Sequence, residues 1–141
     1  MDRFLARLSR DFEYAVELRE ARLLTPRYRD LLARHGVAHT YNYWSAMPGL
    51  SDQASIVPPE ETPFTVVRLL LRPGTWYEQQ RERFRPFNRL VEPDEGMRAE
   101  LVSLARRALS RRRPTFVLVN NKAEGSSPLT VLALARLLGQ D

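Results

Sequence analysis

Three charged residues in otherwise β-type segments are the first candidates for chemistry. Glu17 and Arg19 lie in the alternating segment 14–19, and Arg68 interrupts the apolar run 65–71. Side chains alternate along a strand, so Glu17 and Arg19 share one face, opposite an apolar face. A carboxylate and a guanidinium there offer acid–base chemistry and an anion clamp. They can equally pair with each other or with Arg68, because a buried charge without a partner is costly.

Asn120 and Asn121 end the last predicted strand, one on each of its faces. An asparagine there either donates to a substrate oxygen or forms and caps a turn. The turn that follows, residues 124–127, precedes a helix and would present main-chain N–H groups to an anion. It lacks the spacing and lysine of a P-loop, and Ser126 or Ser127 as a helix N-cap is the alternative.

Metal and thiol chemistry have little support in the sequence. The chain has no cysteine, which excludes disulfides, thiolate catalysis and cysteine-ligated metals. His35 and His39 are the only histidines, and His35 falls at a predicted helix end, where it would act as a cap. We therefore predict no metal site. The sequence names no cofactor.

The elements that must position these residues alternate between strand and helix. Strands are predicted near residues 13–19, 37–43, 65–71 and 115–120. Helices are predicted over residues 2–10, 25–36, 93–113 and 128–138, with a loop after the second strand and a helical turn plus an irregular segment over 75–92. This alternation predicts an α/β fold with a largely parallel sheet. Ligands bind such sheets at the carboxyl ends of the strands.

The composition places the chain in the globular class. With 141 residues, 43% hydrophobic and 28% charged, we expect a single domain, residues 1–141. No stretch approaches the roughly 20 apolar residues of a membrane helix, and the N-terminus is charged rather than signal-like. We therefore expect a cytoplasmic protein with no membrane contact.

The chain is arginine-rich, with a net charge of +5 and Lys122 as its one lysine. Clustered cations bind nucleic acid by releasing counterions from phosphates. Only Arg106 and Arg107 with residues 111–113 form a dense cluster, and at a helix end such cations also complement the helix dipole. Nucleic acid is thus possible as a partner but is not the favoured one.

Four segments in the same order carry a resemblance to a known family. They are Tyr-Ala-Val-Glu-Leu-Arg at 14–19, His-Gly-Val-Ala at 35–38, Val-Arg-Leu at 67–69, and 119–130, where paired asparagines precede a glycine-containing turn and a small-residue helix. The chain resembles the YecE-like family, the TIM-barrel-like domain of unknown function 72, over about residues 4–138. By this resemblance the chain corresponds to the C-terminal half of the family's barrel. It is too short for the whole barrel, because eight strands need roughly 200 residues or more.

The resemblance implies half of a TIM-type (β/α) barrel, with Glu17 and Arg68 inside it near the ligand end. The chain departs from the family at two places: Asn42 replaces a common aspartate, and 70–71 is Leu-Leu instead of His-Gly. We expect a site for a small anionic or phosphorylated ligand, and whether the protein is an enzyme stays open. The candidate ligand-binding residues are Glu17, Arg19, Asn42, Arg68, Asn120 and Asn121.

Two other functions stay open, a non-catalytic nucleic-acid-binding module and a degenerate interaction domain. A half barrel also leaves two sheet edges and an interior uncovered, which are aggregation hazards. We therefore expect self-association or an N-terminal half-barrel partner.

Overall fold

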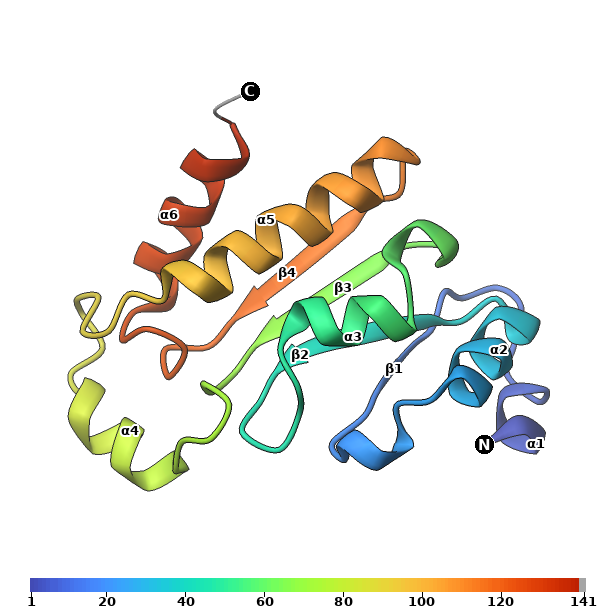
Figure 1. Ribbon diagram of the computed structural model, residues 1–141, viewed down its shortest axis with the longest axis horizontal. Helices are drawn as coiled ribbons and strands as arrows, with labels where there is room; N and C mark the ends of the chain where they lie inside the picture. Colours follow the sequence, from blue (N-terminus) through green and yellow to red (C-terminus); the bar gives the residue numbers. More distant parts are fainter. Residues whose placement is uncertain (140–141) are drawn as a thin grey trace.

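The computed structural model describes residues 1–139 and contains a four-stranded parallel sheet (Figure 1). The strands are β1 (Ala15–Glu17), β2 (Ala38–Tyr43), β3 (Thr65–Leu69) and β4 (Thr115–Val119). They lie side by side in chain order, and each pairs in parallel with the next. The predicted α/β class is confirmed. The correspondence to half of a TIM-type barrel stays a prediction.

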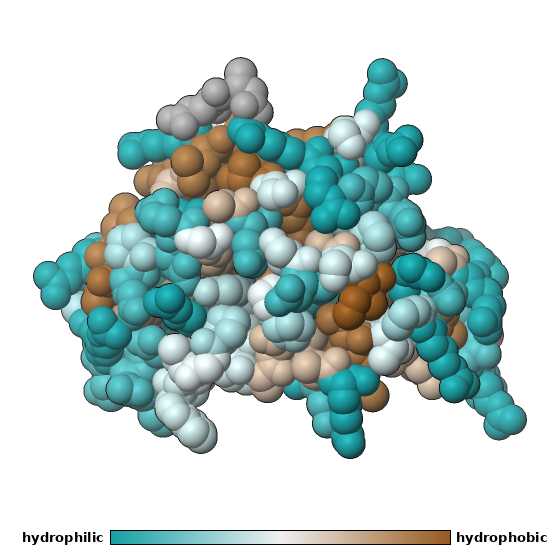
Figure 2. Space-filling view, viewed as in Figure 1, coloured by the Kyte–Doolittle hydropathy of each residue, from teal (hydrophilic) through white to brown (hydrophobic). Residues whose placement is uncertain are grey.

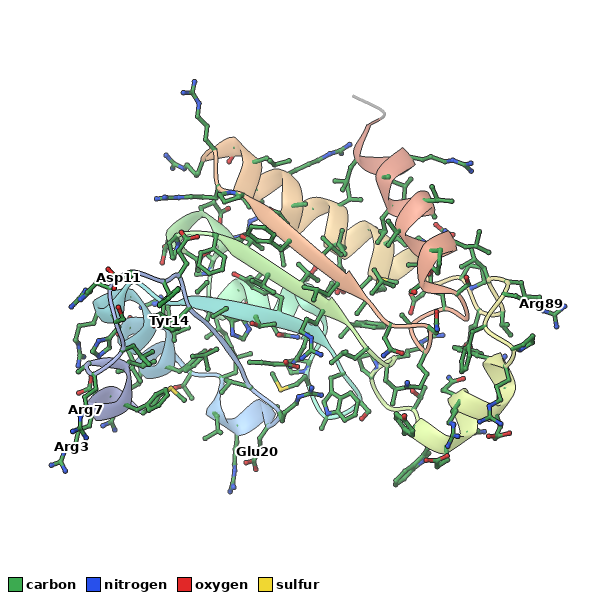
Figure 3. All side chains as sticks on the ribbon, turned by 180° about the vertical axis from the view of Figure 1, so that it is seen from behind. Arg3, Arg7, Asp11, Tyr14, Glu20 and Arg89 are labelled. Atoms are coloured by element: carbon green, nitrogen blue, oxygen red, sulfur yellow. The ribbon has the colours of Figure 1, made fainter. Side chains whose placement is uncertain are left out.

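Helical segments precede, connect and follow the strands, and those that pack on the sheet lie over one of its faces (Figure 1). They are α1 (Asp2–Leu5), η1 (Ala21–Leu23), α2 (Pro26–His35), α3 (Leu50–Ile56), η2 (Pro59–Glu61), α4 (Tyr77–Phe84), α5 (Glu95–Ser110) and α6 (Ser127–Leu138). Seen from behind, the sheet has no helix in front of it (Figure 3). We call this uncovered side the open face. None of the described helices is long and apolar enough to cross a membrane.

The core lies between the sheet and its helices. Tyr41 and Tyr43 of β2 and Val67 and Leu69 of β3 are at most 7% exposed and pack against α3 and α5. A second cluster lies under α2 and includes Leu18. These residues occupy alternate positions of their strands, so the positions between them face the open side.

The open face follows from the strand register. Glu17, Thr40, Val66 and Phe116 stand in one row across the sheet. The next row toward the carboxyl ends contains Asn42, Arg68 and Leu118. The rows are polar at β1 and β2 and apolar at β4, which divides the open face into two chemically different halves.

The structure corrects three predictions about the helices. The loop predicted after β2 contains α3, whose start has no local side-chain cap. Its first N–H groups instead donate to Glu100 of α5, from Leu50 at 2.7 Å and from Ser51 at 3.3 Å. The helix predicted over 2–10 ends at Leu5, since Ser9 and Asp11 bond to each other and compete with helical bonding. The helical turn predicted within 75–92 is an eight-residue helix, α4.

His39 lies in a buried polar network on the helix side of the sheet and is fully inaccessible to solvent. Its Nδ1 lies 3.0 Å from the Tyr28 hydroxyl and its Nε2 lies 3.2 Å from Gln53 Oε1. The Gln53 amide donates to the Asn42 and Pro48 carbonyls, at 2.8 Å each, so its oxygen accepts from the imidazole. Burial lowers the pKa of His39 to about 4 against a usual 6.5. The imidazole is therefore neutral at pH 7.

His39 should make the folded state sensitive to mild acid. The unfolded chain binds the proton near pH 6.5 and the folded chain only near pH 4, so stability falls as pH drops through this window. Between pH 7 and pH 5 the loss attributable to His39 should be about 2 kcal/mol. Urea unfolding of the parent and of His39→Gln at both pH values measures it. Equal pH dependence in the two proteins would contradict the assignment.

Candidate functional site

Glu17, Asn42 and Arg68 come together on the open face near the carboxyl ends of β1, β2 and β3. Arg68 Nη1 donates to Glu17 Oε2, and Asn42 Nδ2 donates to Glu17 Oε1 at 3.1 Å. Asn42 Nδ2 also donates to the Leu18 carbonyl at 2.6 Å. Three strands distant in sequence thus converge on one carboxylate.

Arg19 completes this group from the end of β1. Its Nη2 lies 3.0 Å from Glu17 Oε1, and its guanidinium carbon lies 4.7 Å from the centre of the Trp44 ring. The aromatic face and the carboxylate together orient the guanidinium. We call Glu17, Arg19, Asn42 and Arg68 the open-face cluster.

The open-face cluster is positively charged and partly accessible. One carboxylate faces two guanidiniums, whose side chains are 48% exposed in Arg19 and 36% in Arg68. Asn42 is fully buried, and its Oδ1 has no hydrogen-bond partner among the described residues.

Asn120 and Asn121 serve the turn after β4. Asn120 Oδ1 accepts from the Lys122 N–H at 3.0 Å, and Asn121 Oδ1 accepts from the Ser127 N–H at 2.7 Å. The Asn120 main chain donates to the Leu69 carbonyl at 2.8 Å, which places it at the carboxyl edge of the sheet. No described contact joins either asparagine to the open-face cluster. Their role as ligand-binding residues stays a prediction.

Among the arginines near the end of α5, Arg107 is paired with an acidic residue. Arg107 forms two contacts with Glu60, Nε to Oε1 at 2.6 Å and Nη2 to Oε2 at 2.9 Å. This pairing lowers the pKa of the Glu60 carboxyl and raises the pKa of the Arg107 guanidinium. The remaining arginines at 111–113 are exposed at the helix end.

The structure also reveals a buried polar group that the sequence reasoning missed. Glu124 is fully buried; its Oε2 accepts from Arg98 Nη2 at 3.0 Å, and Arg98 Nε lies 2.9 Å from Oε1 without the alignment of a hydrogen bond. Glu124 Oε1 also accepts from the Asp94 N–H at 2.7 Å. Tyr43 donates to Asp94 Oδ2 at 2.5 Å, and burial raises the pKa of that phenol. We call Tyr43, Asp94, Arg98 and Glu124 the buried ion-pair group.

The buried ion-pair group joins the turn after β4 to the start of α5. Asp94 Oδ1 accepts from the Met97 N–H at 3.0 Å and caps that helix. Gly125 has φ +117°, and a Cβ there would stand 2.6 Å from the Arg89 carbonyl oxygen. The close approach requires glycine at this position. The only sequence signal for this group was an acidic residue, Glu124, directly before Gly125. Its partner Arg98 lies 26 residues away, so the ion pair could not be inferred from the local sequence.

The described residues include no group of three or more histidine, cysteine, aspartate or glutamate side chains able to hold a metal ion. The donors present in the open-face cluster are guanidiniums, one amide and one carboxylate. Such a set matches an anion better than a cation, because guanidinium groups only donate.

Comparison with protein families assigns the chain. It matches the family described as protein of unknown function DUF72 over residues 1–141. The chain belongs to this family, as the four sequence motifs predicted. Searches of curated proteins and of solved structures find no match.

Arg98→Met should destabilise the protein strongly, because it leaves the Glu124 carboxylate buried without its cation. We expect a loss of about 3 to 5 kcal/mol in the free energy of unfolding. Arg81→Met is the matched control, since Arg81 forms only an exposed ion pair with Glu78 and should cost less than about 1 kcal/mol. Urea unfolding measures both. Similar losses in the two variants would contradict the structural role of the buried ion-pair group.

Proposed function

We propose that this protein binds a small anionic ligand, carrying a phosphate or a carboxylate, at the open-face cluster. The observation that supports the proposal is the sharing of one carboxylate, Glu17, by the guanidiniums of Arg19 and Arg68. The pairing leaves one positive charge in excess. An anion seated between the arginines would balance that charge, and it would lie at the strand ends where parallel sheets bind ligands.

The donors available at the cluster suit a phosphate or carboxylate. Arg68 contacts Glu17 through Nη1 and Arg19 contacts it through Nη2. A guanidinium has five N–H donors, so each arginine keeps donors that no described protein contact uses. Planar guanidinium groups bind phosphate and carboxylate oxygens in pairs.

A purely structural role is the competing explanation, and energetics separates the two. Arg19 and Arg68 are 48% and 36% exposed, but Glu17 is only 18% exposed. The group therefore lies between surface ion pairs, which contribute about 0 to 1 kcal/mol, and buried ion pairs, whose disruption costs about 3 to 5 kcal/mol. A structural pair predicts a large loss of stability when Arg68 is removed, whereas a ligand site predicts a small loss of stability together with a loss of binding.

Arg68→Leu should abolish anion binding with little loss of stability. In a thermal-shift screen with inorganic phosphate, phosphorylated sugars and small dicarboxylates, a compound at about 100 times its Kd should stabilise the parent by about 2.7 kcal/mol. Arg68→Leu should show no such shift. Arg89→Leu is the control, because it removes the same charge from a side chain that points away from the protein (Figure 3). A large drop of Tm in Arg68→Leu, with no compound stabilising the parent, would make Arg68 structural.

Glu17→Gln should increase affinity for the same anions. The single amide oxygen can still accept either from Arg19 and Asn42 or from Arg68, which leaves the other side without an acceptor, and the negative charge that competes with the ligand is gone. We expect affinity to rise at least several-fold, by analogy with the cost of like charges placed close together. Titration calorimetry of the parent and the variant with the compound found in the screen measures the ratio. Weaker binding by Glu17→Gln would show that the carboxylate contacts the ligand favourably.

A further inference from the structure

The outer edge of β4 is one of the two strand edges of the described sheet. β3 occupies one side of β4, and no strand lies on the other. The Asn120 N–H donates to Leu69 and the Pro114 carbonyl accepts from Thr65, so the even-numbered positions of this segment face β3. Alternate residues of a parallel strand bond to opposite neighbours. The main-chain groups of Thr115, Val117 and Val119 therefore face outward.

The side chains of β4 do nothing to protect this edge. Its sequence, Thr-Phe-Val-Leu-Val, contains no charge, proline or glycine. Phe116 is 52% exposed and Leu118 is 51% exposed on the open face. Protein edges are normally blunted by charges, by proline or by short strands. The opposite edge shows two of these devices, because β1 has only three residues and contains Glu17.

We propose that two copies of this chain associate through their β4 edges, antiparallel and centred on Val117. This register makes Val117 a hydrogen-bonded pair with its own copy and places Thr115 opposite Val119, which uses every outward-facing group. Phe116 of one copy then faces Leu118 of the other in a pair without hydrogen bonds. Side chains approach most closely in such pairs. The segment is self-complementary, as a two-fold interface requires.

Helix α6 extends the same surface on the other side of the sheet. It contacts β4 and α5 and lies beyond the outer side of β4 (Figure 1). Its exposed residues Leu129, Val131 and Leu132 are 37–54% accessible, and apolar surface gathers over α6 in the space-filling view (Figure 2). These side chains would cover β4 of the second copy.

The area available suits a dimer. Phe116, Leu118 and the three exposed α6 residues present on the order of 400 Å² of apolar surface in each copy. When the surfaces of both copies and the main chain of β4 are added, the total buried area approaches the roughly 1,200 Å² at which specific interfaces begin. A patch of this size also marks an interaction site on a monomer.

Light scattering after size exclusion tests the association. The parent should have the mass of a dimer at micromolar concentration, and Leu118→Lys should be a monomer because it places a charge within the paired edge. Leu23→Lys is the control: Leu23 is 49% exposed on η1, which precedes α2 at the far end of the sheet, and this variant should stay dimeric. Circular dichroism should show folded protein in all three. A monomeric parent, or a dimeric Leu118→Lys, overturns the proposal.

Cysteine pairing tests the register, since the chain has no cysteine of its own. Phe116→Cys and Leu118→Cys are purified separately and then mixed under mild oxidation. The antiparallel register predicts a disulfide-linked dimer in the mixture at several times the yield of either variant alone, because like positions are diagonal and farther apart. If the parent is dimeric but the mixed disulfide is not enriched, this interface is wrong. Parallel pairing of β4 with the β1 edge of a second copy would give that result.

Discussion

A parallel sheet covered on one face only is the constraint on which the other features of this protein depend. Parallel sheets are normally buried on both faces, because their crossover helices lie on them. Here α2, α3 and α5 lie over the same side. The open face must therefore be stabilised by polar pairing where it meets water and by contact with another surface where it is apolar. The open-face cluster supplies the polar pairing across β1 to β3. At β4, the exposed side chains of Phe116 and Leu118 provide the apolar surface that another surface would cover.

The buried ion-pair group holds the carboxyl end of this sheet together. Glu124 receives a main-chain N–H of the α5 cap and the guanidinium of Arg98, so the last βα turn is bound to the start of the longest helix. Tyr43 extends the group to the end of β2 through Asp94. These contacts lie on the helix side of the sheet. The open-face cluster lies at the same strand ends on the other side of the sheet.

Charge is distributed between these two groups according to solvent access. In the buried ion-pair group, Arg98 and Glu124 are each at most 9% exposed in their side chains and pair with one another. The second carboxylate, Asp94, faces the half-exposed Arg72, whose Nε lies 3.6 Å from Oδ2. In the open-face cluster the guanidiniums outnumber the carboxylates and remain accessible. A buried excess charge would be expensive, whereas an accessible one costs little and attracts an anion. The excess positive charge of the open-face cluster is thus accessible to solvent.

The sequence by itself determined the α/β class, the four strands, the face on which Glu17 and Arg68 lie, and the family. These follow from local signals: strand alternation, apolar runs, proline and glycine at helix ends, and short motifs. Only the tertiary structure decided that α3 is a helix, since Glu100 caps it from 50 residues away, and that Glu124 pairs with Arg98. It also decided that Asn42 and Arg68 stand side by side, and that Glu17 pairs with both Arg19 and Arg68, which the sequence had offered as alternatives. The physical reason is that register and long-range side-chain pairing depend on which strands meet, and no local pattern encodes the partner.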